Sequence, residues 1–388
     1  MKRNETADER RFTRMDPTKI GVQRRASAVP ARRTIRRLGG MIQPARQINL
    51  ALLGFGHVGR AFAHILLKRR KWLLKEFGLE WKITGIATRN HGMAMESAGL
   101  PVQKILRAWK SGRILDRYHS GPACSSTTDF IRLCGADVLF ETTLLELSGE
   151  PATTYIREAL GAGIHVVTTN KGPVATHFRA LTRLARLRGV RFLYEGTVMD
   201  GAPVFNLMRQ SLPGTRIHSL RGILNSTTNY ILTQMEQGAS FGAALQYAQD
   251  QGVTEADPLL DLEGWDAAAK LSILIQALMG GSTRPEEIRR KGISEDSGKL
   301  VRGAVRRDRR LRLVARAYRQ GEKVIGKVEP EELEMFDPLA AIRGLSNILV
   351  LNTDTMRELA IVENNPGVEQ TAFALFSDFV TLLRRPQA

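Results

Sequence analysis

Hydrophobic residues recur along the chain in patterns that predict strands alternating with helices. An apolar run at 48–53 is followed by the loop Gly54–Gly59 and then by apolar residues at helical spacing. Short apolar runs at 81–90, 138–141 and 165–169 predict further strands, and a helical pattern separates the last two. A strand, a helix and a second strand in this order pair in parallel through a right-handed crossover. This part of the chain therefore predicts an α/β domain of the doubly wound type.

The pattern changes in the second half of the chain. Strands at 218–224 and 324–330 bracket a long helical region at 227–280, which predicts a second domain of the α+β class. The apolar run at 371–384 predicts a helix that returns to pack on the first domain. We expect the basic run at 306–319, with the sequence RRDRRLRLVARAYR, to coat an exposed helix.

Composition places the chain among soluble globular proteins. Of its 388 residues, 43% are hydrophobic and 25% are charged, which is ordinary for that class. Its apolar runs are broken well short of the roughly 20 residues that a membrane span requires, and the N-terminus does not show the pattern of a secretory signal. Cys124 and Cys134 occur outside any metal-binding spacing. Two lone cysteines fit a reducing compartment, so we expect a cytoplasmic protein.

The net charge of +18 is concentrated at the N-terminus. Residues 1–46 contain 13 lysines and arginines against four acidic residues and lack apolar periodicity, which predicts a disordered basic arm. Two interpretations remain open: the arm contacts nucleic acid, or the chain starts at Met41 and the arm has no role. We favour a passive arm and expect no nucleic-acid partner.

The loop after the first strand has the sequence GFGHVG and matches the dinucleotide-binding fingerprint between a strand and a helix. Gly54 permits the tight turn, Gly56 lets the backbone approach a pyrophosphate, and Gly59 allows the helix to pack closely on the strand. The helix N-terminus offers free N–H groups to the phosphates. We therefore expect the cofactor to contact the whole loop, Gly54, Phe55, Gly56, His57, Val58 and Gly59, with His57 on the surface of the turn.

The second strand ends where the adenosine ribose of a bound dinucleotide is expected. An acidic residue at this point selects NAD, and a basic residue accepts the 2′-phosphate of NADP. This chain has Thr88, Arg89 and Asn90 here, without an acid. We therefore favour NADP(H) with Arg89 on the phosphate. NAD(H) remains the alternative, in which Arg89 stacks on adenine or faces solvent.

Lys171 directly follows the strand at 165–169, in the sequence TTNKGPVA. Ligands of open α/β sheets bind beyond the carboxyl ends of the strands. We therefore expect Lys171 where the nicotinamide and its substrate meet, rather than in a solvated loop. Thr143 follows the neighbouring strand at 138–141 and is expected at the same edge.

A second dense cluster has the sequence GVTEADPLLDLEGWDAAAKL. Asp266 and Lys270 are four residues apart and share one face of a helix. An exposed pair of this kind contributes only about 0.3–0.5 kcal/mol. This helix is otherwise apolar, so Lys270 is expected at the edge of a core. A half-buried lysine among carboxylates indicates a functional site.

The chain resembles homoserine dehydrogenases from about residue 47 onwards. The motifs that carry the resemblance are GFGHVG, TTNKGPVA, YEGTVMDGAPVF, GILNSTTNYIL, GVTEADPLLDLEGWDAAAKL and NNPGVEQTAFALFSD. The resemblance implies the reversible NAD(P)-linked reduction of L-aspartate 4-semialdehyde to L-homoserine, a step in threonine and methionine biosynthesis. It implies a dinucleotide-binding domain at 47–195, a substrate-binding and dimerisation domain at 196–360, and a segment at 361–388 that returns to the first domain.

The resemblance also assigns roles to single residues. Lys171 and Lys270 match the lysines at the reacting carbon, and Lys270 matches the general acid. The substrate contacts that the family implies are Glu255, Asp261 and Asp266, with Asp261 orienting Lys270 or the substrate. The cofactor-lining positions that it implies are Thr143, Lys171, Gly252 and Gly367.

The family further implies a sodium site and a homodimer joined through the second sheet. The residues that match the sodium site are Glu195, Val198, Asp200 and Ala202; the alternative is that Glu195 caps a turn. No aspartate kinase module precedes the first domain and no regulatory domain follows residue 388, so we expect a monofunctional enzyme.

Two residues depart from the family pattern. Asp200 stands where a small residue is usual, and Ser226 replaces a glycine. A serine would strain its loop if that position needed a positive φ. For this reason a related oxidoreductase acting on another amino-acid aldehyde or amino acid remains the alternative.

Overall fold

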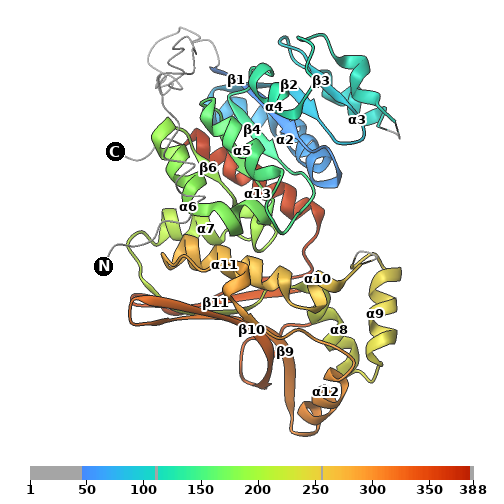
Figure 1. Cartoon of the computed structure of the whole chain (residues 1–388), viewed down its shortest axis with the longest axis vertical. Coiled ribbons are helices and arrows are strands. Elements are labelled where there is room, and N and C mark those ends of the chain that lie inside the picture. The colour runs from blue at the N-terminus through green and yellow to red at the C-terminus, as the bar shows by residue number, and fades with distance from the viewer. Residues whose placement is uncertain (1–45, 110–111, 255–256, 385–388) are drawn as a thin grey trace.

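The structure is a computed structural model, and it describes residues 46–109, 112–254 and 257–384. The described chain forms two β-sheets with helices around them, one above the other in Figure 1. Glu255 and the predicted basic arm, apart from Arg46, lie outside the described residues. No helix of the described chain is long and apolar enough to cross a membrane.

The first sheet has the strand order β3-β2-β1-β4-β5-β6. Its strands are β1 (Arg46–Leu53), β2 (Leu79–Ala87), β3 (Met93–Met95), β4 (Val138–Glu141), β5 (His165–Thr168) and β6 (Phe192–Leu193). The associated helices are α2 (His57–Phe77), α3 (Val102–Arg107), α4 (Thr127–Leu133), α5 (Ala152–Gly161) and α6 (Lys171–Arg188). All neighbouring strands pair in parallel except β3, which is antiparallel to β2. The predicted dinucleotide-binding fold is thus confirmed.

The second sheet has the strand order β12-β11-β7-β9-β10-β8 and is antiparallel except between β8 and β10. Its strands are β7 (Ile217–Ile223), β8 (Arg289–Arg290), β9 (Arg309–Gln320), β10 (Lys323–Glu334), β11 (Asn347–Thr353) and β12 (Arg357–Glu363). Its helices are α7 (Val204–Asn206), α8 (Ser226–Glu236), α9 (Phe241–Asp250), α10 (Leu259–Leu262), α11 (Trp265–Leu278) and α12 (Ser297–Arg306). The predicted α+β architecture of the second domain is confirmed.

The prediction of an exposed helix at 306–319 is wrong, because most of this run forms β9 in the middle of the second sheet. Alternate residues from Leu311 to Ala317 are apolar and buried, which is the pattern of a strand with an apolar face on the core. On the other face, Arg312 is fully buried and forms an ion pair with Glu236. Arg316 pairs with Glu331 of β10. Two of the arginines that suggested a solvated helix are therefore paired with carboxylates of the second domain, and one of them is fully buried.

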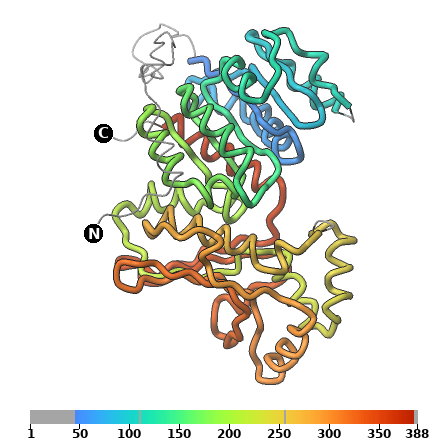
Figure 2. The backbone as a smooth tube through the Cα atoms, in the orientation of Figure 1, coloured from blue at the N-terminus to red at the C-terminus, as the bar shows by residue number. Residues whose placement is uncertain are grey.

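The helix α13 (Val368–Leu383) runs from the end of the second sheet back into the first domain (Figure 2). Its Phe376 ring lies 5.9 Å from that of Trp72 on α2, and its Phe379 ring lies 5.8 Å from that of Phe140 on β4. The chain therefore crosses between the two sheets twice.

Helices α6 and α11 pack against each other between the two sheets (Figure 1). Two α11 side chains donate hydrogen bonds to the same α6 carbonyl: Gln276 Nε2 to Ala175 O at 2.8 Å and Ser272 Oγ to Ala175 O at 3.3 Å. This contact places the start of α6, with Lys171, beside Lys270 of α11.

Candidate active site

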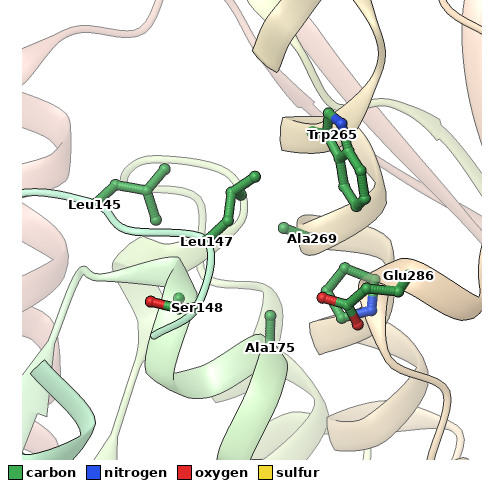
Figure 3. A pocket seen from close by; sticks show the side chains of 9 residues that line it. Leu145, Leu147, Ser148, Ala175, Trp265, Ala269 and Glu286 are labelled. Carbon is green, nitrogen blue, oxygen red and sulfur yellow. The ribbon is translucent and has the colours of Figure 1, made fainter. Parts of the chain in front are cut away.

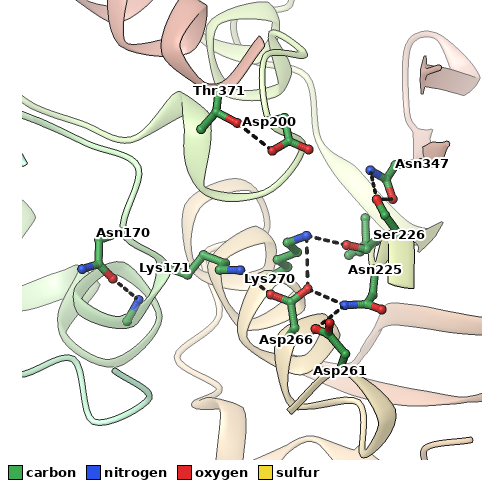
Figure 4. Close-up of polar contacts among 12 residues, drawn as sticks. Asn170, Lys171, Asp200, Asn225, Ser226, Asp261, Asp266, Lys270, Asn347 and Thr371 are labelled. Atoms are coloured by element: carbon green, nitrogen blue, oxygen red, sulfur yellow. Dashed lines mark hydrogen bonds and ion pairs between the residues drawn. The ribbon is translucent and has the colours of Figure 1, made fainter. Parts of the chain in front are cut away.

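Lys171 is the first residue of α6, and the local sequence explains why the helix begins there. Asn170 is the N-cap, and its side chain accepts a hydrogen bond from the Gly172 N–H at 3.2 Å. Pro173 is tolerated in the first turn because its missing N–H would have no helical partner. The Lys171 side chain points from this helix end toward α11 (Figure 4).

The two predicted lysines meet at one carboxylate. Lys171 Nζ forms an ion pair with Asp266 Oδ1, and Lys270 Nζ lies 3.2 Å from Asp266 Oδ2 (Figure 4). Only 24% of the Lys171 side chain, 12% of Lys270 and 8% of Asp266 is exposed. The structure therefore brings Lys171 together with Asp266 and Lys270, which lie about 95 residues further along the chain.

Asn225 organises the same cluster and was missed by the sequence reasoning. Its Nδ2 donates to Asp266 Oδ2 at 3.0 Å and to Asp261 Oδ1 at 2.7 Å, which places Asp261 beside the lysine cluster. Its Oδ1 accepts from the Thr228 N–H at 2.9 Å and caps α8. An asparagine before Ser-Thr-Thr is a recognisable N-cap signal, but the signal does not reveal the carboxylates that its amide holds.

The electrostatics of the cluster follow from burial and charge. Burial acts to raise the pKa of Asp266, but Lys171 and then Lys270 outweigh it and hold that pKa well below its usual range. Burial acts to lower the pKa of Lys270, but Asp266 and then Asp200 outweigh it, so the pKa of Lys270 is raised. Burial and the Asp266 charge raise the pKa of Asp261. The sequence alone did not decide whether the pKa of Lys270 is raised or lowered; in the structure it is raised.

The two departures from the family pattern differ in their backbone. Asp200 is left-handed, with φ of 30°, and its Oδ1 accepts from Thr371 Oγ1 at 2.9 Å (Figure 4). Ser226 is not among the left-handed residues of the described chain. Its hydroxyl and the Asn347 side chain exchange hydrogen bonds at 3.1 and 3.3 Å. The strain considered for Ser226 is therefore absent.

The glycine-rich loop has the geometry that the fingerprint predicts. Gly54 has φ of 92°, and a Cβ there would lie 2.5 Å from Thr142 O. A Cβ on Gly59 would lie 2.6 Å from the Gly54 carbonyl oxygen. A Cβ on Gly56 would meet nothing within 4 Å, so this glycine alone of the three faces open space. That space lies at the N-terminus of α2, where a pyrophosphate is expected.

Aromatic and cationic side chains lie next to this loop. The Phe55 ring lies 5.0 Å from Trp109, and the Arg60 guanidinium lies 5.3 Å from the Trp109 ring centre. Arg60 also donates to the Phe55 carbonyl at 3.1 Å. Arg89, directly after β2, is exposed, as is His57 at the start of α2. Sequence reasoning missed Trp109, because a lone tryptophan after a short helix has no distinguishing pattern.

The other predicted cofactor positions are placed as follows. Thr143 follows β4, and its N–H donates to Glu141 Oε1 at 2.8 Å. Gly367 is the N-cap of α13. Gly252 follows α9 in the second domain, with φ of 65°.

A cavity lies between the loop after β4, the first turns of α6 and the first turns of α11 (Figure 3). Its volume is about 140 Å³, and its walls are mainly apolar. The lining residues are Leu145, Leu147, Ser148, Gly172, Ala175, Trp265, Ala269, Pro285 and Glu286. The loop after β4 and helix α11 thus face each other across the boundary between the two domains.

Glu195 is buried at the same boundary, near Asp378 of α13. Burial and the Asp378 charge raise the pKa of Glu195 to about 8, and burial raises the pKa of Asp378 to about 6. The Glu195 carboxylate accepts the N–H groups of Phe205 at 2.7 Å and Asn206 at 2.8 Å. A cation here would offset the charge of two buried carboxylates, so the residues fit a hard monovalent ion. The same bonds also show Glu195 capping α7.

The described residues contain no group of three or more His, Cys, Asp or Glu side chains arranged to hold a metal ion. A sodium site would therefore depend on backbone carbonyls beside Glu195. The predicted carbonyl positions are Val198, Asp200 and Ala202; Val198 and Ala202 are buried, and Asp200 is partly buried.

Two family models match the chain. The model described as homoserine dehydrogenase matches residues 203–380, and the model of the homoserine dehydrogenase NAD-binding domain matches residues 54–195. The chain belongs to the homoserine dehydrogenase family. It is therefore an oxidoreductase of amino-acid biosynthesis, and the activity expected from its motifs, the reversible NAD(P)-linked reduction of L-aspartate 4-semialdehyde to L-homoserine, is confirmed.

Individual homoserine dehydrogenases resemble the chain over most of their length. An NAD(+)-dependent homoserine dehydrogenase of Pseudomonas canavaninivorans is 37% identical over 86% of this chain and 96% of its own. The homoserine dehydrogenase of Methanocaldococcus jannaschii is 35% identical over 86% and 98%. The crystal structure of a homoserine dehydrogenase from Thiobacillus denitrificans superposes with a TM-score of 0.74, at 29% identity over 88% of this chain and 74% of that one.

Proposed function

We propose that this homoserine dehydrogenase uses Lys270 as its general acid and base, with Lys171 as a second cation at the reacting carbon. The observation that carries the proposal is the convergence of both ammonium groups, each largely buried, on Asp266 where α6 meets α11. Exposed lysines gain little from such pairing. Two lysines held at one buried carboxylate fit a site that handles developing negative charge.

Lys270 has the contacts that a proton donor needs. Its ammonium group has three N–H donors. One donates to Leu224 O at 2.6 Å, and another faces Asp266 Oδ2 at 3.2 Å. A third is left to point at the aldehyde oxygen, where negative charge would develop during hydride transfer from a nicotinamide cofactor. The raised pKa keeps Lys270 protonated before the reaction.

Lys171 and the two aspartates complete the proposed site. Lys171 lies at the carboxyl end of the first sheet, where the nicotinamide of the family's cofactor would meet the substrate. Asp266 holds both lysines, and Asp261, fixed by Asn225, offers a carboxylate to the substrate ammonium. Glu255, proposed to contact the same ammonium, lies outside the described residues.

The test is NADPH oxidation with L-aspartate 4-semialdehyde, comparing the wild type with Lys270→Ala. We expect turnover to fall by at least about 100-fold, the lower range for loss of a general acid, while NADPH affinity is retained. Lys75→Ala, an exposed lysine on α2, is the matched control. Turnover within a few-fold of wild type in Lys270→Ala would contradict the role of Lys270. A wild type that turns over a related aldehyde much faster would favour the alternative substrate.

For the cofactor, we propose NADP(H) as the preferred form and NAD(H) as the alternative. An exposed arginine and the absence of an acid after β2 support NADP(H). The NAD(+) in the name of the Pseudomonas canavaninivorans relative supports NAD(H). Steady-state kinetics with both reduced cofactors decide between them.

Three further features belong to the proposal. A sodium ion would bind beside Glu195, with the backbone carbonyls of Val198, Asp200 and Ala202 as further ligands, and would so connect the two domains.

A homodimer would form through the second sheet, whose edge strand β12 presents the exposed Val362. Gel filtration with light scattering tests the dimer. A cytoplasmic location is supported by two cysteines that are both free.

A further inference from the structure

Glu141 is a fully buried carboxylate at the edge of the sheet where the cofactor and Lys171 are expected to meet. It is the last residue of β4, and it is 0% exposed. A buried carboxylate is costly unless hydrogen bonds satisfy it. Burial raises its pKa, and hydrogen bonds from Thr143 and Thr168 oppose that effect. The carboxylate is therefore kept at this position by specific donors.

The donors come from two different segments of the site. Oε1 of Glu141 accepts the Thr143 N–H at 2.8 Å and the Thr143 hydroxyl at 2.5 Å. Oε2 accepts the Thr168 hydroxyl at 2.6 Å. Thr143 begins the loop after β4, and Thr168 ends β5. Glu141 therefore joins two neighbouring strand ends.

The same network continues to Lys171. Thr168 Oγ1 accepts the Asn170 N–H at 2.9 Å, and Asn170 caps the helix that Lys171 begins. The Asn170 amide in turn donates to the Leu144 carbonyl at 3.3 Å and to Thr143 Oγ1 at 3.4 Å. A displacement at Glu141 would thus reach both the loop after β4 and the first turn of α6.

Close packing reinforces this connection. A Cβ on Gly172 would lie 2.3 Å from the Glu146 carbonyl oxygen, so the loop lies directly on the first turn of α6. The loop and the helix start have little freedom to move separately. The backbone around Lys171 therefore depends on the loop that Glu141 anchors.

We propose that Glu141 is a positioning residue that fixes the cofactor-lining Thr143 and the helix start bearing Lys171 in one geometry. The inference rests on the proposed roles of Thr143 and Lys171. Glu141 acts through these groups and does not itself contact the reacting atoms. Misplacement of a reacting group by about 1 Å can cost roughly 100-fold in rate.

The test compares Glu141→Gln with Glu236→Gln. The control removes a carboxylate that is also buried, paired with Arg312 in the second domain. Measured quantities are Tm, kcat, KM for NADPH and the primary isotope effect with 4-deuterated NADPH. We expect both variants to lower Tm. We expect Glu141→Gln alone to lower kcat, by roughly 10- to 100-fold, and to increase the isotope effect because the hydride step becomes slower.

Unchanged kcat, KM and isotope effect in folded Glu141→Gln would overturn the inference. Equal kinetic losses in Glu236→Gln would overturn it as well, because they would reflect stability alone. If Glu141→Gln does not fold, Thr168→Val removes one donor to the carboxylate and the same kinetic readouts decide. Glu141→Asp, which keeps the charge, is expected to recover part of the rate. A wild type inactive on L-aspartate 4-semialdehyde would contradict the proposed function instead.

Discussion

Lys171 and Lys270 contact opposite oxygens of the Asp266 carboxylate. The two lysines belong to different domains, so this single carboxylate pairs with two cations across the domain boundary. Neither lysine could remain close to the other without it, because both are partly removed from water. Asp266 is therefore central to the site and to the contact between α6 and α11.

The first prediction concerns Asp266→Asn. Removing one partner of a buried ion pair leaves uncompensated charge, and we expect the free energy of unfolding to fall by about 3–5 kcal/mol. Turnover should fall as well, since the lysines then repel each other. Urea unfolding and steady-state assays measure both effects. Glu158→Gln, which removes the partly exposed partner of the exposed Arg132, should change stability by less than about 1 kcal/mol.

The effect of Asp266→Asn should also depend on pH. The pKa of Asp266 is lowered in the folded state, so its stabilising contribution is present above the unfolded value and is lost as pH falls through acidic values. The stability difference between wild type and variant should therefore be large at neutral pH and shrink below about pH 4. A difference independent of pH would contradict the ionised state of Asp266.

The second prediction concerns the pH dependence of catalysis. In the proposed role, Lys270 must hold a proton to reduce the aldehyde and must lack it to accept one from homoserine. Because its pKa is raised, the alkaline fall of the reductive kcat/KM should lie above the ordinary lysine value of about 10.5. Homoserine oxidation should increase with pH over the whole range that the protein tolerates. An oxidative rate that levels off near neutral pH would exclude Lys270 as the group that titrates.

The third prediction separates two glycines of the loop. Gly56→Ala should leave Tm nearly unchanged, because the new Cβ meets open space and φ is −71°. It should raise KM for the cofactor by roughly 10-fold or more, since the pyrophosphate is expected in that space. Gly59→Ala should instead lower Tm, because its Cβ would approach the Gly54 carbonyl oxygen to 2.6 Å. If Gly56→Ala and Gly59→Ala lowered Tm equally, the assignment of open space to Gly56 and of close packing to Gly59 would be refuted.

The fourth prediction concerns Arg89→Asp. A carboxylate after β2 repels the 2′-phosphate and can accept the ribose hydroxyls of NADH. The ratio of kcat/KM for NADPH to that for NADH should therefore fall by at least roughly 10-fold, the equivalent of about 1.4 kcal/mol. Arg69→Asp, an exposed arginine on α2, provides the same charge change elsewhere. A similar ratio in both variants would remove Arg89 from cofactor selection.

Local pattern predicted the elements of the first sheet well. The predicted strand at 138–141 matches β4, and the strand at 165–169 matches β5 to within one residue. Both strands are central, so their apolar runs are unbroken and easily recognised. The incorrect prediction of an exposed helix where the structure has β9 arose because distant contacts, rather than a local apolar pattern, determine this strand. Its Arg312 is buried through a partner distant in sequence, Glu236, which no local pattern reveals.

The residues of the candidate site likewise fall into those that the sequence predicted and those that it did not. The lysines and aspartates were predicted because their motifs resemble those of a known family. The amide of Asn225 and the carboxylate of Glu141 were not, since their roles depend on contacts across 41 and 27 residues of sequence, to Asp266 and Thr168 respectively. Hydrogen-bond partners at such separations are set by tertiary packing rather than by periodicity.

The paired hydrogen bonds from Gln276 and Ser272 to the Ala175 carbonyl have a consequence for ligand entry. These bonds connect α6 and α11, the helices that carry Lys171 and Lys270, and they do not involve the dinucleotide or the aldehyde. An opening that preserves these two hydrogen bonds would have to occur outside the contact between α6 and α11. Lys270, the proposed proton donor, is thus already held beside Asp266, and the substrate carbonyl would bind next to it.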